Sequence, residues 1–275
     1  MKTKNTLIAG VVLASAFFAR QASAQFQLMD NFSAYADGNL PGQGGWISTA
    51  SPSGITVASH TAVLGNPGVV DPTYEALPAA IPHTSTAATF FMQFSLSGVT
   101  TTGNGNNFNF ELTQASAPAD LSTSAQVQFN YDSTSSRLPA VRNGGAFAQI
   151  SLNGSTVYTP LANSLYSLWF VVDNNAGTYQ AFIQGGDITS QTQIQSTTGV
   201  STFSFRTATA NPLITFNMGA GGTVGNTDPQ TVFDLFEDPN GVNLSNPGIV
   251  PEPGTLSLLG LGALVAAFRF RRQRA

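Results

Sequence analysis

Apolar and polar residues alternate with a period of two through much of the chain between residues 25 and 246. In 108–112 the apolar positions hold Phe, Phe and Leu, and in 125–131 they hold Ala, Val, Phe and Tyr, with Asn, Gln or Glu between them. Successive side chains of a β-strand point to opposite faces of its sheet. These runs therefore predict strands with one apolar and one polar face.

Further strands are predicted wherever the same kind of run recurs between turn-forming residues. They are 55–64, 89–96, 146–152, 165–173, 178–183, 202–206, 213–218 and 231–236. The total is about ten strands, and no segment between the two ends of the chain has the 3.6-residue period of a helix. Antiparallel strands bury one face by stacking as two sheets, so we expect an all-β, two-sheet antiparallel sandwich.

Residues 165–183 predict a hairpin that contains a central strand. The turn Asn174-Asn175-Ala176-Gly177 joins two apolar runs, and it places Asn and Gly where left-handed backbone conformations are needed. The residues from Trp169 to Val172 are all apolar, which indicates a strand buried on both faces.

Composition restricts the partners of the segment from Gln25 to Pro253. This segment has no cysteine, so its fold depends on packing and sheet hydrogen bonds. Its basic residues are Arg137, Arg142 and Arg206 against 14 acidic residues, which gives a net charge near −11. Such a surface repels nucleic acid and anionic glycans and is compatible with cations or neutral sugars. We therefore expect no nucleic-acid partner.

Residues 1–24 have the organisation of a secretory signal peptide. Lys2 and Lys4 precede an apolar run from Leu7 to Ala19, and Ala22-Ser23-Ala24 offers small residues for cleavage before Gln25. This order predicts a signal helix, its removal by signal peptidase and export of the rest of the chain.

Residues 247–275 form a second targeting segment. Pro251, Glu252 and Pro253 predict an extended, accessible stretch, because each proline disfavours helix in the residue before it. The apolar run from Thr255 to Phe268 would reach only about 21 Å as a helix, against a hydrocarbon core of about 30 Å. We expect a transmembrane helix over about 255–270 that arginine stems help to complete. The basic cluster on its cytoplasmic side consists of Arg269, Arg271, Arg272 and Arg274.

These three parts, in this order and at the end of the chain, resemble the PEP-CTERM sorting signal of Gram-negative bacteria. The resemblance implies recognition by exosortase, transient anchoring in the inner membrane and cleavage near Pro251 to Pro253. The protein would then be released or attached at the cell surface, usually in bacteria that make extracellular polysaccharide. The alternative is an uncleaved anchor with a single membrane span.

Three stretches of residues 25–246 resemble a concanavalin A-like, or laminin-G-like, jelly roll. The first is Asp30-Asn31-Phe32 with Gly42-Gln43-Gly44-Gly45-Trp46, and the second is the hairpin sequence from Tyr166 to Asn174. The third is Val232 to Phe236, followed by Gly241 to Ser245. The resemblance implies one jelly-roll β-sandwich domain over 25–246.

No arrangement of carboxylates identifies a catalytic site. Jelly-roll polysaccharide hydrolases need paired carboxylates, of the type Glu-x-Asp-x-x-Glu, so that an acid and a nucleophile flank the glycosidic bond. Glu111 is alone in its strand, and the acids of 234–238 have a different order. His60, in the predicted strand 55–64, and His83 have no metal-like spacing and no Gly-x-Ser-x-Gly motif beside them. We nominate no catalytic residue.

Two kinds of ligand have candidate residues. A structural calcium ion needs several converging oxygen ligands, and the candidates are Asp234, Asp238 and Asn240, for which turn capping is the more usual role. Aromatic rings stack on sugars, and the candidates are Trp46, Tyr131 and Tyr179, although rings in strand patterns more often belong to a core or a hairpin pair. Trp46 in particular follows a glycine-dense loop and is suited to closing one edge of the core.

Two functional classes are compatible with these observations. We expect an exported surface or extracellular-matrix protein, and the first class is a non-catalytic glycan-binding or structural β-sandwich that contacts extracellular polysaccharide. The second class is a carbohydrate-active enzyme, a hydrolase or a lyase, with an unrecognised active site. Paired carboxylates in a concave groove would favour the enzyme, whereas a groove lined by Asn, Gln and aromatic residues without such a pair would favour binding.

Overall fold

The computed structural model describes residues 25–48, 54–65, 71–96, 106–118, 125–132, 137–207, 210–222 and 230–247. All of the elements that it defines are β-strands, which confirms the predicted all-β class. The predicted signal helix over 1–24 and transmembrane helix over 255–270 lie outside the described residues. The chain divides into one compact unit from Met1 to Asn243 and another from Leu244 to Ala275.

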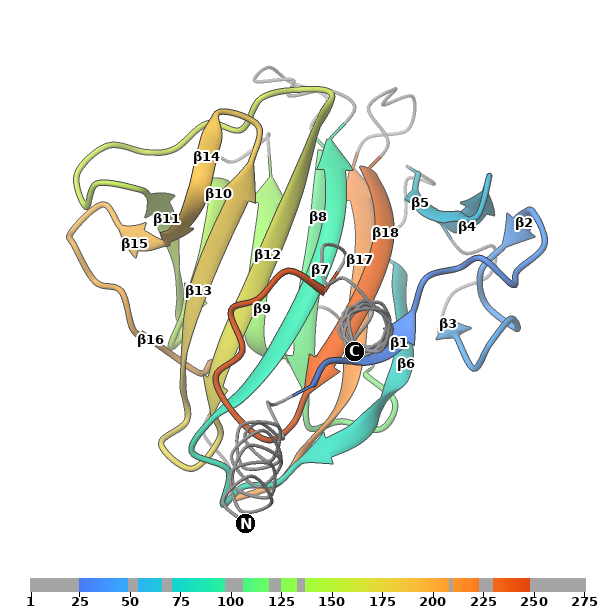
Figure 1. Cartoon of the computed structure of the whole chain (residues 1–275), viewed down its shortest axis with the longest axis horizontal. Coiled ribbons are helices and arrows are strands. Elements are labelled where there is room, and N and C mark those ends of the chain that lie inside the picture. The colour runs from blue at the N-terminus through green and yellow to red at the C-terminus, as the bar shows by residue number, and fades with distance from the viewer. Residues whose placement is uncertain are drawn as a thin grey trace, which may run out of the picture. The chain divides into compact units, whose positions relative to one another are not determined.

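Ten strands form one antiparallel sheet, here called the ten-stranded sheet (Figure 1). Its order is β14-β13-β12-β7-β18-β5-β4-β2, while β1 pairs with β18 and β16 pairs with β13. The bounds are β1 Gln27–Asp30, β2 Gly38–Asn39, β4 Ile55–Ala58, β5 Thr61–Leu64, β7 Ala88–Leu96, β12 Ser164–Asp173, β13 Thr178–Gly185, β14 Ile188–Gln193, β16 Phe203–Ser204 and β18 Gln230–Asp238.

The other strands form the eight-stranded sheet, in the order β15-β11-β10-β9-β8-β17-β6-β3. In Figure 1, β7 and β12 pass in front of β8 and β9, and side chains of the two sheets are in contact, which confirms the predicted two-sheet sandwich. The bounds are β3 Ile47–Ser48, β6 Asp71–Ile81, β8 Asn106–Thr113, β9 Ala125–Asp132, β10 Arg137–Asn143, β11 Ala146–Ser151, β15 Gln195–Ser196 and β17 Leu213–Gly222.

The hairpin of β12 and β13 confirms the predicted central strand. Both Leu168 and Trp169 are fully buried although they point to opposite faces of β12. Gly177 adopts a left-handed backbone with φ of 66°, but the asparagines of the turn do not, so that part of the prediction was wrong. The side chain of Asn174 instead donates hydrogen bonds to the carbonyl oxygens of Ile81 and Asn211.

The predicted strand 55–64 is divided into β4 and β5 by a two-residue turn. Ser59 and His60 both have positive φ, 51° and 62°, as in the tight turns that suit the twist of a hairpin. His60 therefore lies in a turn and not in a strand, which corrects the prediction. The backbone N–H of Ser59 donates to the carboxylate of Asp37, and this bond stabilises the turn.

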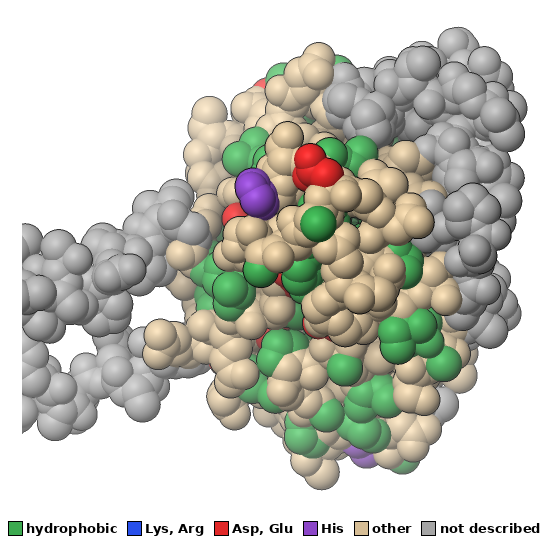
Figure 2. All heavy atoms as spheres, turned by 90° about the vertical axis from the view of Figure 1, so that its right-hand side faces the viewer, with side chains coloured by type: hydrophobic (Ala, Val, Ile, Leu, Met, Phe, Trp, Pro, Cys, Tyr) green, Lys and Arg blue, Asp and Glu red, His purple; other side chains and the backbone are tan. Residues whose placement is uncertain are grey.

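The surface carries few charges. Figure 2 shows a face whose described part is mostly uncharged polar groups and backbone, with apolar patches, a few acidic and histidine side chains and no lysine or arginine. This view agrees with the scarcity of basic residues between Gln25 and Pro253.

Aromatic rings pack between the two sheets and form the core. Phe94 of β7 lies 5.5 Å from Phe110 of β8 and 5.9 Å from Phe129 of β9, measured between ring centroids. Phe90 of β7 stacks on Phe216 of β17 with centroids 4.6 Å apart. Burial of each such ring stabilises the fold by about 1.5–3 kcal/mol. Ring packing therefore supplies stability to a chain that has no cysteine and hence no disulfide.

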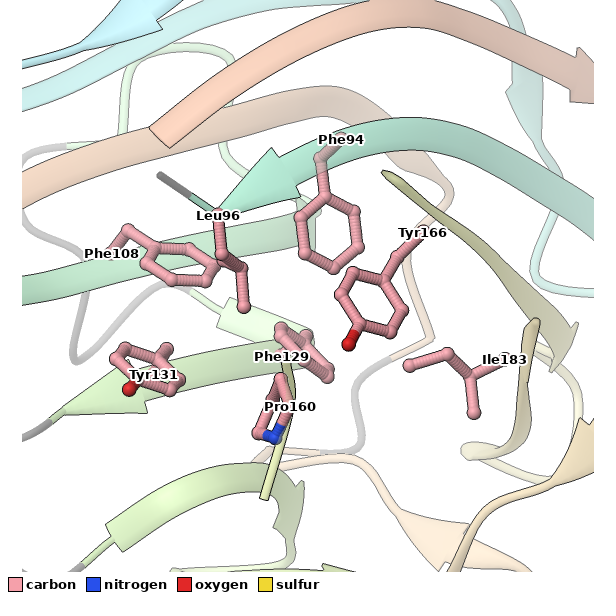
Figure 3. Close-up of a pocket in the computed structure, with 8 residues that line it drawn as sticks. All are labelled: Phe94, Leu96, Phe108, Phe129, Tyr131, Pro160, Tyr166 and Ile183. Atoms are coloured by element: carbon pink, nitrogen blue, oxygen red, sulfur yellow. The ribbon is translucent and has the colours of Figure 1, made fainter. Parts of the chain in front are cut away.

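Figure 3 shows one end of this core, where a narrow gap remains between the sheets. Phe94, Leu96 and Tyr166 point into it from the ten-stranded sheet, and Phe108, Phe129 and Tyr131 point into it from the eight-stranded sheet. The gap is too narrow to admit a water molecule. It is therefore part of the packed core and not a binding pocket.

A buried carboxylate organises the loop between β1 and β3. Asp30 accepts hydrogen bonds from the hydroxyl of Tyr35 and from the indole N–H of Trp46, each at 2.6 Å. Glu75 of β6 lies beside this cluster and against Gly45, whose φ of 103° requires glycine. Burial, reinforced by the charge of Asp30, raises the pKa of Glu75 to about 8.

The raised pKa of Glu75 predicts that its substitution changes stability in a pH-dependent way. The folded protein binds this proton more tightly than the unfolded chain, in which a glutamate titrates near 4.5, so its contribution is lost as pH rises from about 4.5 to about 8. We expect Glu75→Gln to match the parent near pH 4 and to unfold at a higher temperature than the parent at pH 9. A difference in melting temperature that did not change with pH would contradict this account.

Candidate functional site

The outward face of the eight-stranded sheet is rich in amides. In β8 the apolar residues Phe108, Phe110 and Leu112 point into the core, so the residues between them point to the opposite face. The same alternation in β9, β10 and β17 adds four polar side chains to the two of β8, so six lie on this face. We call this set the polar face; it consists of Asn109, Glu111, Gln128, Asn130, Arg142 and Asn217.

The polar face is buried. The six side chains have exposed fractions between 0 and 5%. Amide and charged groups are seldom buried to this degree, because removing them from water costs free energy unless they form hydrogen bonds. A network of such bonds is therefore expected on this face.

The network is present and is centred on Gln128. Its amide nitrogen donates to Glu111 Oε1 at 2.7 Å and to Asn109 Oδ1 at 2.9 Å. Its amide oxygen accepts a hydrogen bond from Arg142 Nε at 3.0 Å. A single amide thus connects a carboxylate of β8 with a guanidinium of β10.

Two further amides extend the network along the sheet. Asn217 of β17 donates to Glu111 Oε2 at 3.1 Å, and Asn130 of β9 donates to Asn109. Both oxygens of Glu111 therefore accept amide hydrogen bonds. This degree of connection holds the carboxylate in one orientation.

Arg142 is held from three sides. Its guanidinium carbon lies 3.9 Å from the centroid of the Phe147 ring, and its Nη1 donates to the carbonyl oxygen of Gly145 at 3.4 Å. From the core side, the hydroxyl of Tyr179 donates to the backbone carbonyl oxygens of Arg142 and Gln128. Burial raises the pKa of Tyr179, so the hydroxyl keeps its proton and remains a donor.

A pocket of about 420 Å³ opens beside Arg142. The strands β10 and β11 supply most of its wall, and Arg206 is contributed by the segment after β16. Ligand pockets typically combine an apolar wall with a few placed polar groups, and this wall has that character. The lining residues are Ala140, Arg142, Gly145, Ala146, Phe147, Gln149 and Arg206.

The pocket and the polar face include one acidic side chain, Glu111, among the residues that the structure describes. Glycoside hydrolysis by the usual mechanism needs two carboxyl groups about 5–10 Å apart. The described part of this face therefore has amides and an aromatic ring without a carboxylate pair. This arrangement suits binding of a polar ligand.

The three aromatic candidates for sugar stacking lie in the core. Trp46, Tyr131 and Tyr179 are 1%, 0% and 1% exposed, and none of them is a lining residue of the pocket. Trp46 contacts Phe32 and Phe216, as expected for a residue that closes the core edge. These rings present no accessible face to a sugar, and their role is in packing.

Two of the three calcium candidates, Asp238 and Asn240, belong to a capped turn. Asp238 accepts hydrogen bonds from the backbone N–H of Asn240 at 3.1 Å and from the side chain of Asn243 at 2.9 Å. Asp234 lies within β18, opposite Gln93, and burial raises its pKa. In the part of the chain that the structure describes, no three His, Asp or Glu side chains gather as a metal site. The geometry is that of turn capping.

Sequence reasoning did not select the residues that line the pocket. Arg142 and Arg206 had been noted only for their charge, and Phe147 had no assigned role. Gln128, which bonds to Arg142 behind the pocket, had no assigned role either. The sequence did contain a signal that points to this face. The polar positions of an alternating strand all lie on one face of its sheet, so Asn109, Glu111, Gln128 and Asn130 could have been grouped from the pattern alone. The sorting residues Pro251, Glu252 and Pro253, and the four arginines after them, lie outside the described residues.

Comparison with known protein families supports the predicted sorting signal at the end of the chain. Residues 250–272 match the PEP-CTERM protein-sorting motif. This match confirms the resemblance of the tail, and the motif implies an exported protein that is anchored in a membrane. No curated protein sequence matches the chain.

Solved structures with a similar arrangement include lectins. Lectin II from Ulex europaeus is 10% identical over 73% of this chain and 95% of its own length, with a TM-score of 0.46. The carbohydrate recognition domain of Emp47p is 12% identical over 81% of this chain and 100% of its own length, with a TM-score of 0.47. A sialidase is 12% identical over 78% of this chain with a TM-score of 0.48, and the match spans only 18% of the sialidase.

The central position of Gln128 predicts that its removal destabilises the fold. Gln128→Ala would leave Glu111 and Arg142 each without one hydrogen bond in a buried setting, and we expect the free energy of unfolding to fall by about 2–4 kcal/mol. Gln180→Ala is the matched control, because Gln180 of β13 makes only an exposed bond of 3.5 Å to Thr202. Gln180→Ala should lower the free energy of unfolding by less than about 1 kcal/mol in the same denaturation experiment. Equal losses would show that the network adds no stability.

Proposed function

We propose that this chain is an exported, non-catalytic glycan-binding protein whose binding surface is the pocket beside Arg142, which the buried polar face supports from behind. The observation that carries the proposal is the buried network of amides and one guanidinium that ends at a pocket lined by Phe147. The second carboxylate that a glycosidase requires is absent from the described residues of this surface.

The chemistry of the site fits a sugar. Amide groups can donate and accept hydrogen bonds, as sugar hydroxyls do, and Gln149 offers such a group in the pocket wall. The ring of Phe147 offers an apolar surface for the C–H face of a pyranose. Because Arg142 is fixed by Gln128, Gly145 and Phe147, little conformational entropy is lost when a ligand binds.

The sorting motif supports a location of the site outside the cytoplasm. In this proposal the signal peptide directs export and signal peptidase removes it after Ala24. Exosortase acts at Pro251 to Pro253 while the segment 255–270 spans the inner membrane. No helix among the residues described is long and apolar enough to cross a membrane. The released or surface-attached domain meets extracellular polysaccharide, which is the partner that this proposal assigns to the pocket.

Binding without hydrolysis is the first test. The full chain, purified in mild detergent, should bind at least one member of a panel of polysaccharides and release no reducing ends from any of them. Phe147→Ala should weaken this binding by about tenfold, because the ring contact is lost. Leu165→Ala is the control, since Leu165 is 46% exposed on β12 and does not line the pocket.

Two results would contradict the proposal. Equal affinities for Phe147→Ala and Leu165→Ala would place the ligand elsewhere on the molecule. Release of reducing ends by the parent that disappears in Glu111→Gln would instead assign an enzymatic function to this face.

The sorting part of the proposal predicts a defect in processing and not in folding. Replacement of Pro251, Glu252 and Pro253 by alanines should leave the chain folded but unprocessed, because these residues form the proposed cleavage region. Intact-mass measurement of the protein recovered from an exosortase-containing host should show a retained tail. Identical masses for the mature parent and the variant would contradict the prediction.

A further inference from the structure

Two of the three arginines between Gln25 and Pro253 line the same pocket. They are Arg142 and Arg206, in a segment with 14 acidic residues and no lysine. The face shown in Figure 2 illustrates how scarce cationic side chains are on the described surface elsewhere. We infer that this pocket binds the carboxylate of an acidic sugar, a uronic acid unit of a polysaccharide; this inference rests on the proposed glycan-binding function and specifies its ligand class.

The chain holds Arg206 at the pocket by fixing the residues before it. Phe203 and Phe205 are buried and contact the ring of Tyr179 in the core. The backbone N–H of Phe205 donates to Gly177 O at 2.8 Å, and that of Arg206 donates to Gln126 O at 3.3 Å. The segment is thus bonded to the ten-stranded sheet and to β9, and it delivers Arg206 to the pocket wall.

The guanidinium of Arg206 has unused hydrogen-bonding capacity. Its Nη1 is buried and has no hydrogen-bond partner. A buried donor left in this state costs about 1–3 kcal/mol, and more when it carries charge. Arg206 lines the pocket, so a turn of its guanidinium that presented Nη1 to a ligand oxygen there would remove this cost through a charge-assisted hydrogen bond.

The rest of the pocket favours an anion over a neutral group. Its lining residues include two guanidinium groups and no Asp or Glu among those that the structure describes. Glu111 lies behind Arg142 in the network, because the amide of Gln128 bonds to both side chains. Both guanidinium groups attract a carboxylate that binds in the pocket.

This local charge refines the expectation from the net charge. An overall charge near −11 disfavours anionic glycans at long range. Salt screens such interactions beyond about 8–10 Å, so contacts inside the pocket depend on the groups that line it. The net charge then lowers the rate of encounter with an acidic polymer and leaves the preference of the pocket intact.

The test compares one polymer in two forms. Polygalacturonate and the same polymer after chemical reduction of its carboxyl groups differ in charge and share their glycosidic linkages. We expect the full chain in mild detergent to bind the acidic form about tenfold or more tightly than the reduced form. Arg206→Gln should abolish this preference, whereas Arg206→Lys should keep part of it, because lysine retains the charge but lacks the planar fork.

Val242→Glu is the matched control for net charge. It changes the total charge by the same amount as Arg206→Gln, at a residue that is 60% exposed and does not line the pocket. If Arg206→Gln and Val242→Glu lowered the affinity for polygalacturonate equally, the inference would be overturned. Equal affinity of the parent for the acidic and reduced polymers would also overturn it, although the proposed glycan binding would still hold. Failure of the parent to bind acidic and neutral polysaccharides alike would overturn the proposed function together with the inference.

Discussion

Phenylalanine rings packed between the two sheets determine where the other side chains of the central strands point. Phe94 of β7 contacts Phe108, Phe110 and Phe129 of the facing sheet, and these contacts fix which face of β8 and β9 is the inner one. Because side chains alternate along a strand, the residues between these rings must lie on the opposite face. The amides of the polar face are thus placed by the packing of the core. A shift of one residue in register would exchange the two faces.

The polar face is costly to build, and its hydrogen bonds offset that cost. Glu111 and Arg142 are nearly excluded from water, and Gln128 joins them through its amide. The hydrogen bonds of this network give each bonded group one favourable orientation, which makes the face rigid. In a chain without cysteine, this rigidity comes from sheet register and side-chain bonds alone. Rigidity is also what a binding surface needs, since it lowers the entropic cost of association.

Local patterns predicted the class of fold and the central hairpin. The alternation in 108–112 and the apolar run from Trp169 to Val172 depend only on neighbouring residues, and both predictions hold in the structure. The turn at Ser59 and His60 was missed, because neither residue is a glycine that would mark a left-handed backbone.

The candidate site could not be predicted in the same way, because its contacts join distant parts of the chain. Asn217 and Glu111 are 106 residues apart in sequence and are hydrogen-bonded through the pairing of β17 with β8. Arg206 reaches the pocket from a segment outside the strands that form most of the wall. The aromatic residues chosen from sequence, such as Trp46, lie in the core, because removing their apolar ring surface from water lowers the free energy of the folded state.

The most direct test of the central claim is a crystal structure of the chain with a bound oligosaccharide of the class that it prefers in solution. The account predicts a sugar unit in the pocket, with its ring against Phe147 and its polar groups within hydrogen-bond distance of Arg206 and Gln149. A sugar bound on the ten-stranded sheet or at the turn after β18, with the pocket empty, would contradict the assignment of this pocket as the glycan site.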